Sequence, residues 1–298
     1  MIPRWLTWTL VALACWGVWA LLSKVIGDAL SAAQSQALST IGLAPVIIWV
    51  ALSKKLGVPG GRTRGSILAF AGGVLSCIGN IAYYSVLNSG AKAATVVPLT
   101  AMYPLVTVLL AVILLKEKLN RIQLSGVVLS LLAIYLFNVQ QERGVISSWL
   151  MVAMIPVAVW GIAGLLQKIS TNSISGELST FWFLLAFVPV ALCLLAREPL
   201  PARIGARSWA LVILLGLTFA LGNLAILLAF ASQGKASIIV PVSGLYPAVS
   251  IPIAIIILGE RVGPREWLGI VVALTAVAAI SIESKAPTPH SAALDQQA

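Results

Sequence analysis

Charged residues are scarce in this chain of 298 residues, where they make up 9% of all positions. Ordinary soluble domains carry about 25% charged residues and about 45–50% apolar ones. Here 60% of the positions are hydrophobic. The composition excludes a soluble enzyme or binding domain, and it predicts a polytopic membrane protein.

Acidic groups are absent from the middle of every long apolar stretch. All nine Asp and Glu residues lie in loops or near the ends of these stretches, and the one histidine, His290, lies in the C-terminal tail. A proton-driven exporter of lipophilic cations needs a buried carboxylate that binds the cation and exchanges it for protons. That class is therefore disfavoured, although a buried lysine could carry a proton instead. No nucleotide-binding loop occurs, so direct coupling to ATP is excluded.

The chain has three cysteines, Cys15, Cys77 and Cys193, and each lies in an apolar stretch. Such residues behave as small hydrophobes there, so we expect no disulfide framework, no metal site and no cofactor. An enzyme would need an activated nucleophile, paired carboxylates or a metal cluster near one face. Since the sequence contains none of these patterns, we expect no enzymatic activity.

The formal net charge is +10, but the basic residues are spread over short loops. Nucleic acid is therefore not an expected partner. The expected partners are the lipid bilayer and a small-molecule substrate, and the chain is expected to act as a monomer or a homodimer.

Long apolar stretches predict ten transmembrane helices, because a bilayer core of about 30 Å requires roughly 20 residues in a helix. They cover residues 5–25, 34–53, 65–88, 93–115, 121–138, 147–170, 176–196, 208–230, 236–258 and 265–283. The tail, residues 284–298, is polar and contains proline, which predicts disorder.

The second half of the chain repeats the first. Residues 79–131 match residues 222–274 at 18 of 53 positions when the sequence is shifted by 143 residues. At a shift of 144, "WGVWALLSK" (16–24) aligns with "WGIAGLLQK" (160–168). The sequence therefore predicts two five-helix units, residues 1–143 and 144–283. Because five is odd, the second unit enters the membrane from the opposite side, which predicts an inverted repeat.

The distribution of Lys and Arg indicates the orientation. With the N-terminus in the cytoplasm, the first half carries 8 basic residues on the inner side and 3 outside, whereas the second half carries 3 inside and 5 outside. Since early helices usually dominate orientation, we expect both termini to be cytoplasmic in a bacterial-type inner membrane.

Several motifs recur at matched positions in the two units. Each has an early Trp-Gly, a proline within its fourth span, an acidic residue at the end of that span ("LLKEKL" 114–119 and "ILGERV" 257–262) and a glycine early in its fifth span. In this the chain resembles the EamA family of the drug/metabolite transporter superfamily, although Lys116 replaces the usual glycine of the first copy. The resemblance implies a ten-helix carrier with cytoplasmic termini, which moves small metabolites by alternating access. Many relatives export amino acids or related compounds.

The fourth and ninth spans carry the clearest candidate site, in "PLTAMYPLVT" (98–107) and "PVSGLYPAVS" (241–250). In each stretch a hydroxyl, a tyrosine and a second hydroxyl are spaced i, i+3 and i+7, so they share one helical face. The candidates are Thr100, Tyr103, Thr107, Ser243, Tyr246 and Ser250.

The prolines in these stretches predict breaks in both helices. Pro104 and Pro247 each lack a backbone donor, which frees the carbonyls of Thr100 and Ser243 four residues earlier. In hydrocarbon a backbone group needs a partner from protein or from a water-filled cavity. The pattern therefore predicts a paired cavity lining. The alternative is a pair of kinks that are satisfied by their own hydroxyls.

Asparagines and a tyrosine mark the third and eighth spans. Asn80, Tyr84 and Asn88 form a polar stripe in the third span, whereas the eighth span keeps only Asn223. The predicted cavity is therefore asymmetric. Asparagine in a membrane helix serves either as a ligand contact or as a link between helices, at about 0.6 kcal/mol.

Two further pairs match between the units. Trp16 and Trp160 could stack on a substrate or pack against a neighbouring helix. Lys24 and Lys168, each in the last part of its span, could surround an anionic solute or snorkel to the headgroups.

Together with the family resemblance, which implies export, these features predict a secondary transporter of a small metabolite, most simply an exporter of an amino acid or a similar carboxylate-bearing solute. The alternatives are uptake or exchange of another small metabolite, such as a sugar or an organic anion, and proton-coupled efflux of a drug or amine.

Overall fold

The structure is a computed structural model, and it describes residues 3–27, 29–53, 62–115, 119–137, 148–232, 236–280 and 282. These residues form thirteen helices and no strand. The helices of the first half are α1 (Arg4–Ile26), α2 (Ala32–Leu52), α3 (Arg62–Asn88), α4 (Ala93–Thr100), α5 (Pro104–Leu115) and α6 (Arg121–Phe137). Those of the second half are α7 (Ser148–Thr171), α8 (Gly176–Leu185), α9 (Phe187–Arg197), α10 (Ala206–Ala231), α11 (Ala236–Ser243), α12 (Pro247–Ile257) and α13 (Pro264–Ile280). The predicted tail, residues 284–298, lies outside the described residues.

The thirteen described helices make up the ten predicted spans, because the fourth, seventh and ninth spans each consist of two helices in line. Seven stretches are long and apolar enough to cross a membrane by length and composition, including α4 with α5 and α8 with α9. The remaining three spans, α6, α11 with α12, and α13, are shorter as described. The all-helical, multi-pass fold is confirmed.

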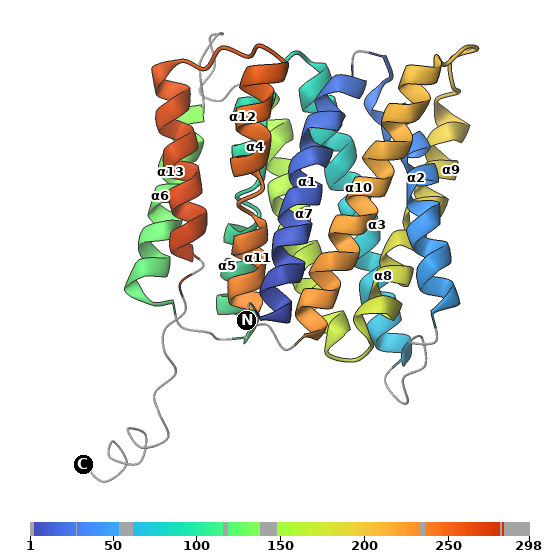
Figure 1. The fold of residues 1–298 in the computed structure, drawn as a ribbon. Coiled ribbons are helices and arrows are strands. Elements are labelled where there is room, and N and C mark those ends of the chain that lie inside the picture. The colour runs from blue at the N-terminus through green and yellow to red at the C-terminus, as the bar shows by residue number, and fades with distance from the viewer. Residues whose placement is uncertain are drawn as a thin grey trace.

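The two halves run in opposite directions through the bundle. In Figure 1, α1 leaves the end of the bundle that holds the N-terminus, whereas α7 runs back toward that end. We call the end where α1 begins, at Arg4, the N-terminal face, and the end where α1 finishes, at Ile26, the far face. The prediction of an inverted repeat is confirmed.

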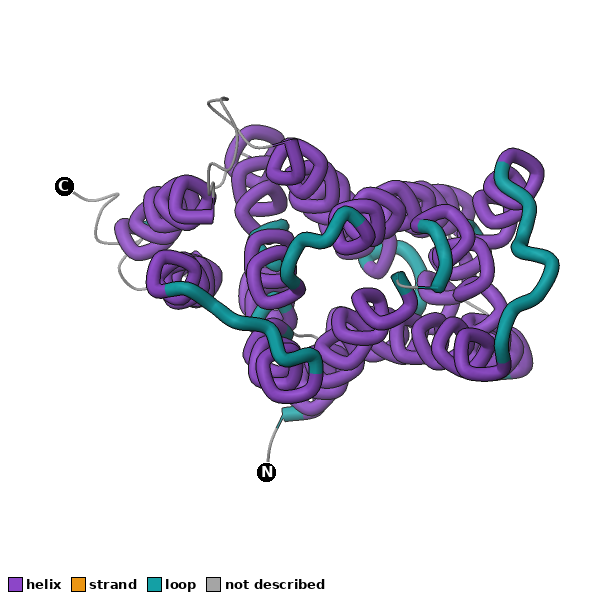
Figure 2. The backbone as a smooth tube through the Cα atoms, turned by 90° about the horizontal axis from the view of Figure 1, so that it is seen from above, coloured by secondary structure: helices purple, strands orange, loops and turns teal. Residues whose placement is uncertain are grey.

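The two halves interlock rather than form separate bodies. The first helix of each half packs along the third span of the other, so that α1 lies beside α10 and α7 beside α3. Viewed from above, these helices surround the centre of the molecule, while α6 and α13 form a pair at one side (Figure 2). Within that pair Gly126 lies against Ile280, and Gly269 lies against Phe137.

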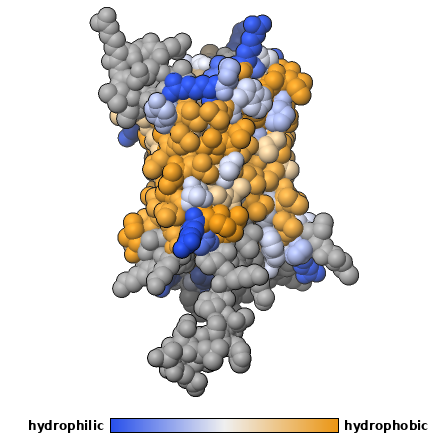
Figure 3. All heavy atoms as spheres, turned by 90° about the vertical axis from the view of Figure 1, so that its left-hand side faces the viewer, coloured by the Kyte–Doolittle hydropathy of each residue, from blue (hydrophilic) through white to orange (hydrophobic). Residues whose placement is uncertain are grey.

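Large apolar side chains cover the outside of the bundle. Ile113 is 70% exposed and Ile256 is 80% exposed, although both lie within spanning helices. Figure 3 shows that apolar residues form a continuous band over the face of α6 and α13, with hydrophilic residues above and below it. Because a bilayer solvates such a surface, the exposed apolar residues favour a membrane-embedded fold.

The predicted breaks of the fourth and ninth spans are confirmed. The chain leaves α4 after Thr100 and re-enters a helix at Pro104, and the same happens between Ser243 and Pro247. The carbonyls freed by the prolines are nevertheless occupied: Thr100 O accepts a hydrogen bond from Tyr103 N at 3.3 Å, and Ser243 O accepts one from Tyr246 N at 3.2 Å. The expectation that these carbonyls are open toward a cavity is therefore wrong, because the tight turn satisfies them.

The seventh span contains a break that the prediction did not include. Helix α8 ends at Leu185 and α9 begins at Phe187. Pro189 lacks a backbone donor, which leaves the Leu185 carbonyl without its usual partner four residues later. The break thus follows the proline rule used for the other two spans.

Candidate substrate cavity

A cavity lies between helices of both halves, where the breaks of the fourth and ninth spans meet the first helices. The cavity volume is about 60 Å³. Its described lining residues are aromatic, aliphatic or uncharged polar, and no charged side chain is among them. They are Trp16, Trp19, Ser76, Tyr103, Trp160, Ala163, Gly164, Gln167, Phe219, Asn223, Ile226, Phe230, Val240, Ser243 and Tyr246.

Two repeat-matched pairs of aromatic rings form part of the cavity wall. Trp16 meets Tyr246 edge-on, with ring centroids 6.4 Å apart, and Trp160 meets Tyr103 in the same way, also at 6.4 Å. Each pair joins one half to the other, because α1 and α7 belong to different units than the tyrosines that they contact. The sequence prediction placed these four residues at the cavity, and the structure brings them together there.

Glycines permit these indoles to lie against the opposite half. A Cβ at Gly79 would collide with the Trp160 indole, and a Cβ at Gly222 would collide with that of Trp16. The two glycines occupy matched positions of the repeat, immediately before Asn80 and Asn223. Their lack of a side chain therefore sets the position of both aromatic walls.

A second glycine pair brings the first helices close to the breaks. A Cβ at Gly17 would lie 2.7 Å from Val249 Cβ, and a Cβ at Gly161 would lie 2.6 Å from Val106 Cβ. Real Cβ atoms almost never approach other atoms this closely. The repeated Trp-Gly dipeptide thus supplies both a cavity wall and the close approach that positions it.

One hydrogen bond joins the two halves at the breaks. The hydroxyls of Tyr103 and Ser243 are 3.3 Å apart, and Ser243 Oγ donates to Val240 O at 2.7 Å. Since the Ser243 proton is engaged with Val240, Tyr103 is the donor of this pair. The matched hydroxyl of Tyr246 is buried and has no hydrogen-bond partner among the described residues.

An amide pair crosses the cavity wall between α7 and α10. Gln167 Nε2 donates to Asn223 Oδ1 at 3.2 Å, and Asn223 Nδ2 donates to Phe219 O at 2.9 Å. The pair leaves Gln167 Oε1 and one Nε2 hydrogen for other partners. Asn223 was predicted to be at the site and Gln167 was not. The sequence did contain a signal for Gln167. It precedes Lys168 in "WGIAGLLQK", at the position where the first copy has Ser23.

Aromatic residues that break the repeat complete the lining. Trp19 stands where the second half has Ala163, and Phe219 stands where the first half has Ser76. Their rings lie 5.7 Å apart. Sequence reasoning missed them because it searched for matched positions.

Three predicted hydroxyl residues do not line the cavity. Thr100 Oγ1 donates to Val96 O at 2.9 Å within its own helix, while Thr107 Oγ1 donates to Gly161 O at 2.8 Å and links α5 to α7. Ser250 is buried, and its hydroxyl has no partner among the described residues.

Two predicted residues of the third span also lie outside the lining. Tyr84 is buried, and its hydroxyl accepts a hydrogen bond from Trp19 Nε1 at 3.1 Å. Asn80 is 1% exposed, and its Oδ1 atom has no hydrogen-bond partner among the described residues. Both lie on the side of α3 toward the far face.

The two lysines lie at opposite faces, and neither lines the cavity. Lys24 Nζ donates to Leu87 O at 3.0 Å and to Ala91 O at 2.9 Å, at the C-terminal end of α3. Lys168 Nζ lies 5.9 Å from the ring centroid of Phe230, which is a lining residue. The structure thus gives Lys24 a contact within the fold and places Lys168 beside the end of the cavity.

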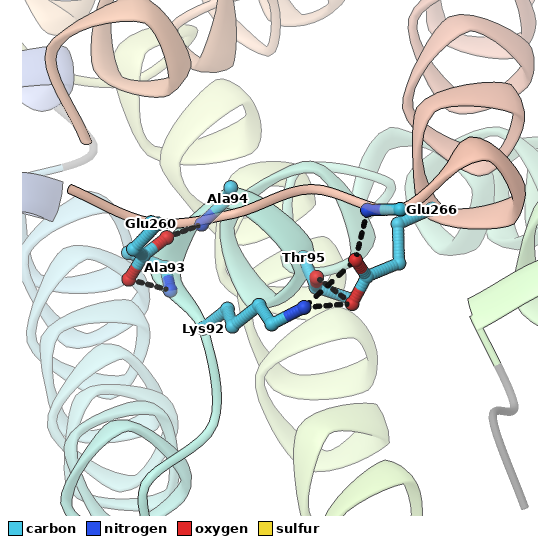
Figure 4. A network of polar contacts seen from close by, with 7 residues as sticks. Lys92, Ala93, Ala94, Thr95, Glu260 and Glu266 are labelled. Carbon is cyan, nitrogen blue, oxygen red and sulfur yellow. Dashed lines mark hydrogen bonds and ion pairs between the residues drawn. The ribbon is translucent and has the colours of Figure 1, made fainter. Parts of the chain in front are cut away.

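A polar network closes the far face between the two halves. The Glu260 carboxylate accepts hydrogen bonds from Ala93 N and Ala94 N, both at 2.8 Å, at the start of α4 (Figure 4). Beside it, Lys92 Nζ lies 2.8 Å from both carboxylate oxygens of Glu266. Glu260 is the acidic residue of the motif at the end of the ninth span. Its carboxylate therefore acts as the N-terminal cap of a helix from the other half.

Comparisons with known proteins agree with this architecture. The model of the EamA-like transporter family matches residues 3–139 and again residues 147–282. An uncharacterized protein of Methanocaldococcus jannaschii is 39% identical over 79 residues, which cover 26% of this chain and 57% of that protein. The match thus spans little more than half the length of this relative. A protein of known crystal structure aligns with a TM-score of 0.65 and 17% identity, over 94% of this chain and 99% of that chain. At this identity the likeness shows the fold alone.

Proposed function

Since this chain belongs to the EamA-like transporter family, we propose that it is a secondary transporter that exports a small carboxylate-bearing metabolite, such as an amino acid. The observation that carries the proposal is the cavity between two inverted halves, which is lined by repeat-matched Trp and Tyr pairs. In carriers built from inverted repeats, the substrate binds at the interface between the repeats, and access alternates between the faces.

The lining selects a solute that carries no net charge. A charged group in a low-dielectric cavity needs a partner of opposite charge, and none is among the described lining residues. The amino and carboxylate groups of a zwitterion balance each other. Its apolar part would pack on Trp16 and Trp19, and its polar groups would bond to the free positions of Gln167. An ammonium group is also favoured by the faces of the aromatic rings.

The carboxylate of the solute would lie toward Lys168, whose amine is next to Phe230 at the end of the cavity. Lys24 does not serve this purpose, since its amine already donates to two carbonyls. Only one of the two predicted lysines therefore supports the binding of an anionic group in this arrangement.

We further propose a bacterial-type inner membrane as the location, with both termini in the cytoplasm. The first-half excess of Lys and Arg supports this orientation. Gln167, Phe230 and Val240 extend the cavity toward the N-terminal face. In this orientation the cavity takes its solute from the cytoplasm, which supports export.

Counterflow in proteoliposomes tests this function. Vesicles are preloaded with an unlabelled amino acid, sugar, organic anion or amine, and uptake of the labelled compound is followed with and without a pH gradient. We expect counterflow of amino acids in the absence of a gradient. Counterflow of sugars or organic anions alone, or an amine flux that requires the pH gradient, would overturn the proposed substrate class.

The Lys168→Met variant tests the position of the carboxylate. Hydrogen bonds to charged groups contribute about 1.5–3 kcal/mol, so the KM of an amino acid should rise about tenfold or more. The KM of the corresponding amino acid amide should stay within about twofold, because it lacks the carboxylate. The control is Arg197→Met, which removes a cation at the end of α9, away from the cavity. An equal rise for both compounds would contradict the proposed pose.

A further inference from the structure

The first and third spans of each half meet along a line that we call a seam: α1 with α3 in the first half, and α7 with α10 in the second. The first-half seam is closed near the far face. Lys24 Nζ donates to the carbonyls of Leu87 and Ala91, and Tyr83 Oη donates to Ala20 O at 3.4 Å. Tyr83 and Leu87 are 0% and 2% exposed.

The second-half seam lines the cavity, although it is built from the matched residues. Lys168 corresponds to Lys24, and Phe230 corresponds to Leu87. Lys168 Nζ makes no hydrogen bond with the described residues and lies 5.9 Å from the Phe230 ring. The seam lines the cavity here through Gln167, Asn223, Ile226 and Phe230.

The counterparts of these four lining residues in the first-half seam are Ser23, Asn80, Tyr83 and Leu87, and none of them is among the lining residues of this cavity. All eight side chains are at most 6% exposed. The two seams therefore differ in their contact with the cavity and in the contacts of their lysines. The same repeat is thus present in two arrangements, one with its seam closed by a lysine and one with its seam lining the cavity.

The closing contact has a physical basis. The last carbonyls of a helix have no partner within the helix, and a cation at that end also interacts favourably with the helix dipole. At the end of α3, the Lys24 amine donates to such carbonyls and also places its positive charge at the negative end of the helix dipole. The end of α10 offers the same kind of carbonyl at Phe230, in its last turn, within the same seam as Lys168.

We propose that Lys24 and Lys168 are two latches that exchange roles during transport. In the opposite state Lys24 releases the end of α3, and Lys168 donates to the carbonyl of Phe230. The first-half seam then opens as a second vestibule toward the far face, lined by Ser23, Asn80, Tyr83 and Leu87. This inference rests on the proposed function as a carrier with alternating access.

One group supports the exchange independently of the lysines. Asn80 Oδ1 is buried without a partner among the described residues, which is unfavourable for an amide oxygen. In the second vestibule it gains the cavity-lining position that Asn223 occupies now. Lys168 binds the carboxylate of the solute in the open state, so its transfer to the Phe230 carbonyl also releases the solute toward the far face.

Cysteine labelling in lipid nanodiscs, where both faces are accessible, tests the exchange. The background replaces Cys15, Cys77 and Cys193 by alanine. Single cysteines are introduced as Leu87→Cys, which reports the second vestibule, as Phe230→Cys, which reports the present cavity, and as Leu43→Cys, a buried control in α2. The rate of reaction with a membrane-impermeant maleimide is measured for each.

The two lysine variants should act in opposite directions. Lys24→Met should raise the labelling rate of Leu87→Cys about tenfold and lower that of Phe230→Cys. Lys168→Met should lower the labelling rate of Leu87→Cys, because it removes the latch of the opposite state. Lys24→Arg, which keeps a cation with donors, should label as the parent does, and Arg197→Met is the matched charge control. Each lysine-to-methionine variant should also slow counterflow.

The exchange is wrong if Lys24→Met leaves Leu87→Cys at the parent rate, or if both lysine variants shift labelling in the same direction. If Lys24→Met also exposes Leu43→Cys, it has unfolded the protein, and the Lys168→Met result then decides. Opposite shifts in a chain without counterflow of any solute would support the latches and contradict the transport function. Normal counterflow without these shifts would support the transport function and contradict the latches.

Discussion

The two faces of the bundle are built from the same repeat, yet they are held together differently. At the far face, Glu266 Oε2 accepts a hydrogen bond from Gly263 N at 2.7 Å and the carboxylate pairs with Lys92. At the N-terminal face the position of Glu266 is taken by Gln123, whose Oε1 accepts a hydrogen bond from Asn120 N at 3.1 Å. The local backbone contact is therefore kept, while the charge is lost.

This difference shows which part of the repeat is local and which part acts between the halves. The contact with the residue three positions earlier caps α6 and α13 alike, so a Gln or a Glu can provide it. Only a carboxylate can also pair with a lysine at the start of the neighbouring span. Lys235, the counterpart of Lys92, lies outside the described residues, but the residue aligned with Glu266 is uncharged. The repeat thus favours closure of the far face over closure of the N-terminal face.

Removal of the Glu260 carboxylate should cause the largest change in how stably the far face is closed. Glu260→Ala leaves Ala93 N and Ala94 N without their acceptors, which costs about 2 kcal/mol at most for a helix cap. We expect the labelling rate of Leu87→Cys to rise by about tenfold or more, since the far face is then less stably closed. The isosteric Glu260→Gln should give a smaller rise. An unchanged rate in Glu260→Ala would show that the cap does not hold the far face closed.

The hydroxyls of the two matched tyrosines, Tyr103 and Tyr246, should differ in their contribution to the stability of the folded protein. Tyr103→Phe removes a buried hydrogen bond to Ser243, at a cost of about 1 kcal/mol. Tyr246→Phe removes a hydroxyl without a partner among the described residues, so it should leave stability unchanged. Thermal unfolding of both variants in the same detergent measures the difference. Equal losses of stability would contradict the asymmetry of the hydroxyls.

Glu266→Gln makes the far face like the N-terminal face. The variant keeps an oxygen for Gly263 N but loses the ion pair with Lys92. Because the Lys92 side chain is 42% exposed, this ion pair contributes about 0.7 kcal/mol. We expect the labelling rate of Leu87→Cys to rise about threefold in low salt. High salt should reduce this difference, because it screens the ion pair of the parent. A salt-independent effect would point to packing instead of charge.

Gln123→Glu makes the reverse change and should have the smallest effect. In the repeat, a carboxylate at position 123 restores the acid that is aligned with Glu266, and Lys235 is the counterpart of Lys92. An ion pair of this kind contributes about 0.4 kcal/mol. The labelling rate of Phe230→Cys should fall by up to about twofold. Combined with Glu266→Gln, it should restore the parent balance of the two labelling rates. A fall in the rate of Leu87→Cys would mean that the two faces are not coupled in opposite directions.

Much of the cavity could be predicted from the sequence because the repeat marks it. Trp16, Trp160, Tyr103 and Tyr246 were found as matched pairs, and they form the two aromatic walls. Gln167 and Trp19 were missed, because each lies at a position where the two copies differ. A search for differences within matched motifs, such as Gln167 against Ser23, would have found them.

Two of the misplaced candidates have a common cause. Lys24 and Asn80 are matched with Lys168 and Asn223 in the repeat, and sequence reasoning placed all four at the site. A single arrangement of the protein opens only one seam at a time, so only one member of each pair can approach the cavity. Symmetry in the sequence therefore predicts more site residues than one structure displays.

The sequence by itself determined the membrane environment, the ten spans, the inverted repeat and the breaks before Pro104 and Pro247. These follow from hydrophobic length, from the odd number of spans per unit and from the missing donor of proline, all of which are local properties. Only the tertiary structure decided which repeat-matched side chains face the cavity and which face of the bundle is closed. Those outcomes depend on contacts between helices of opposite halves, such as Glu260 with the start of α4, and two repeat-matched segments can take different partners there.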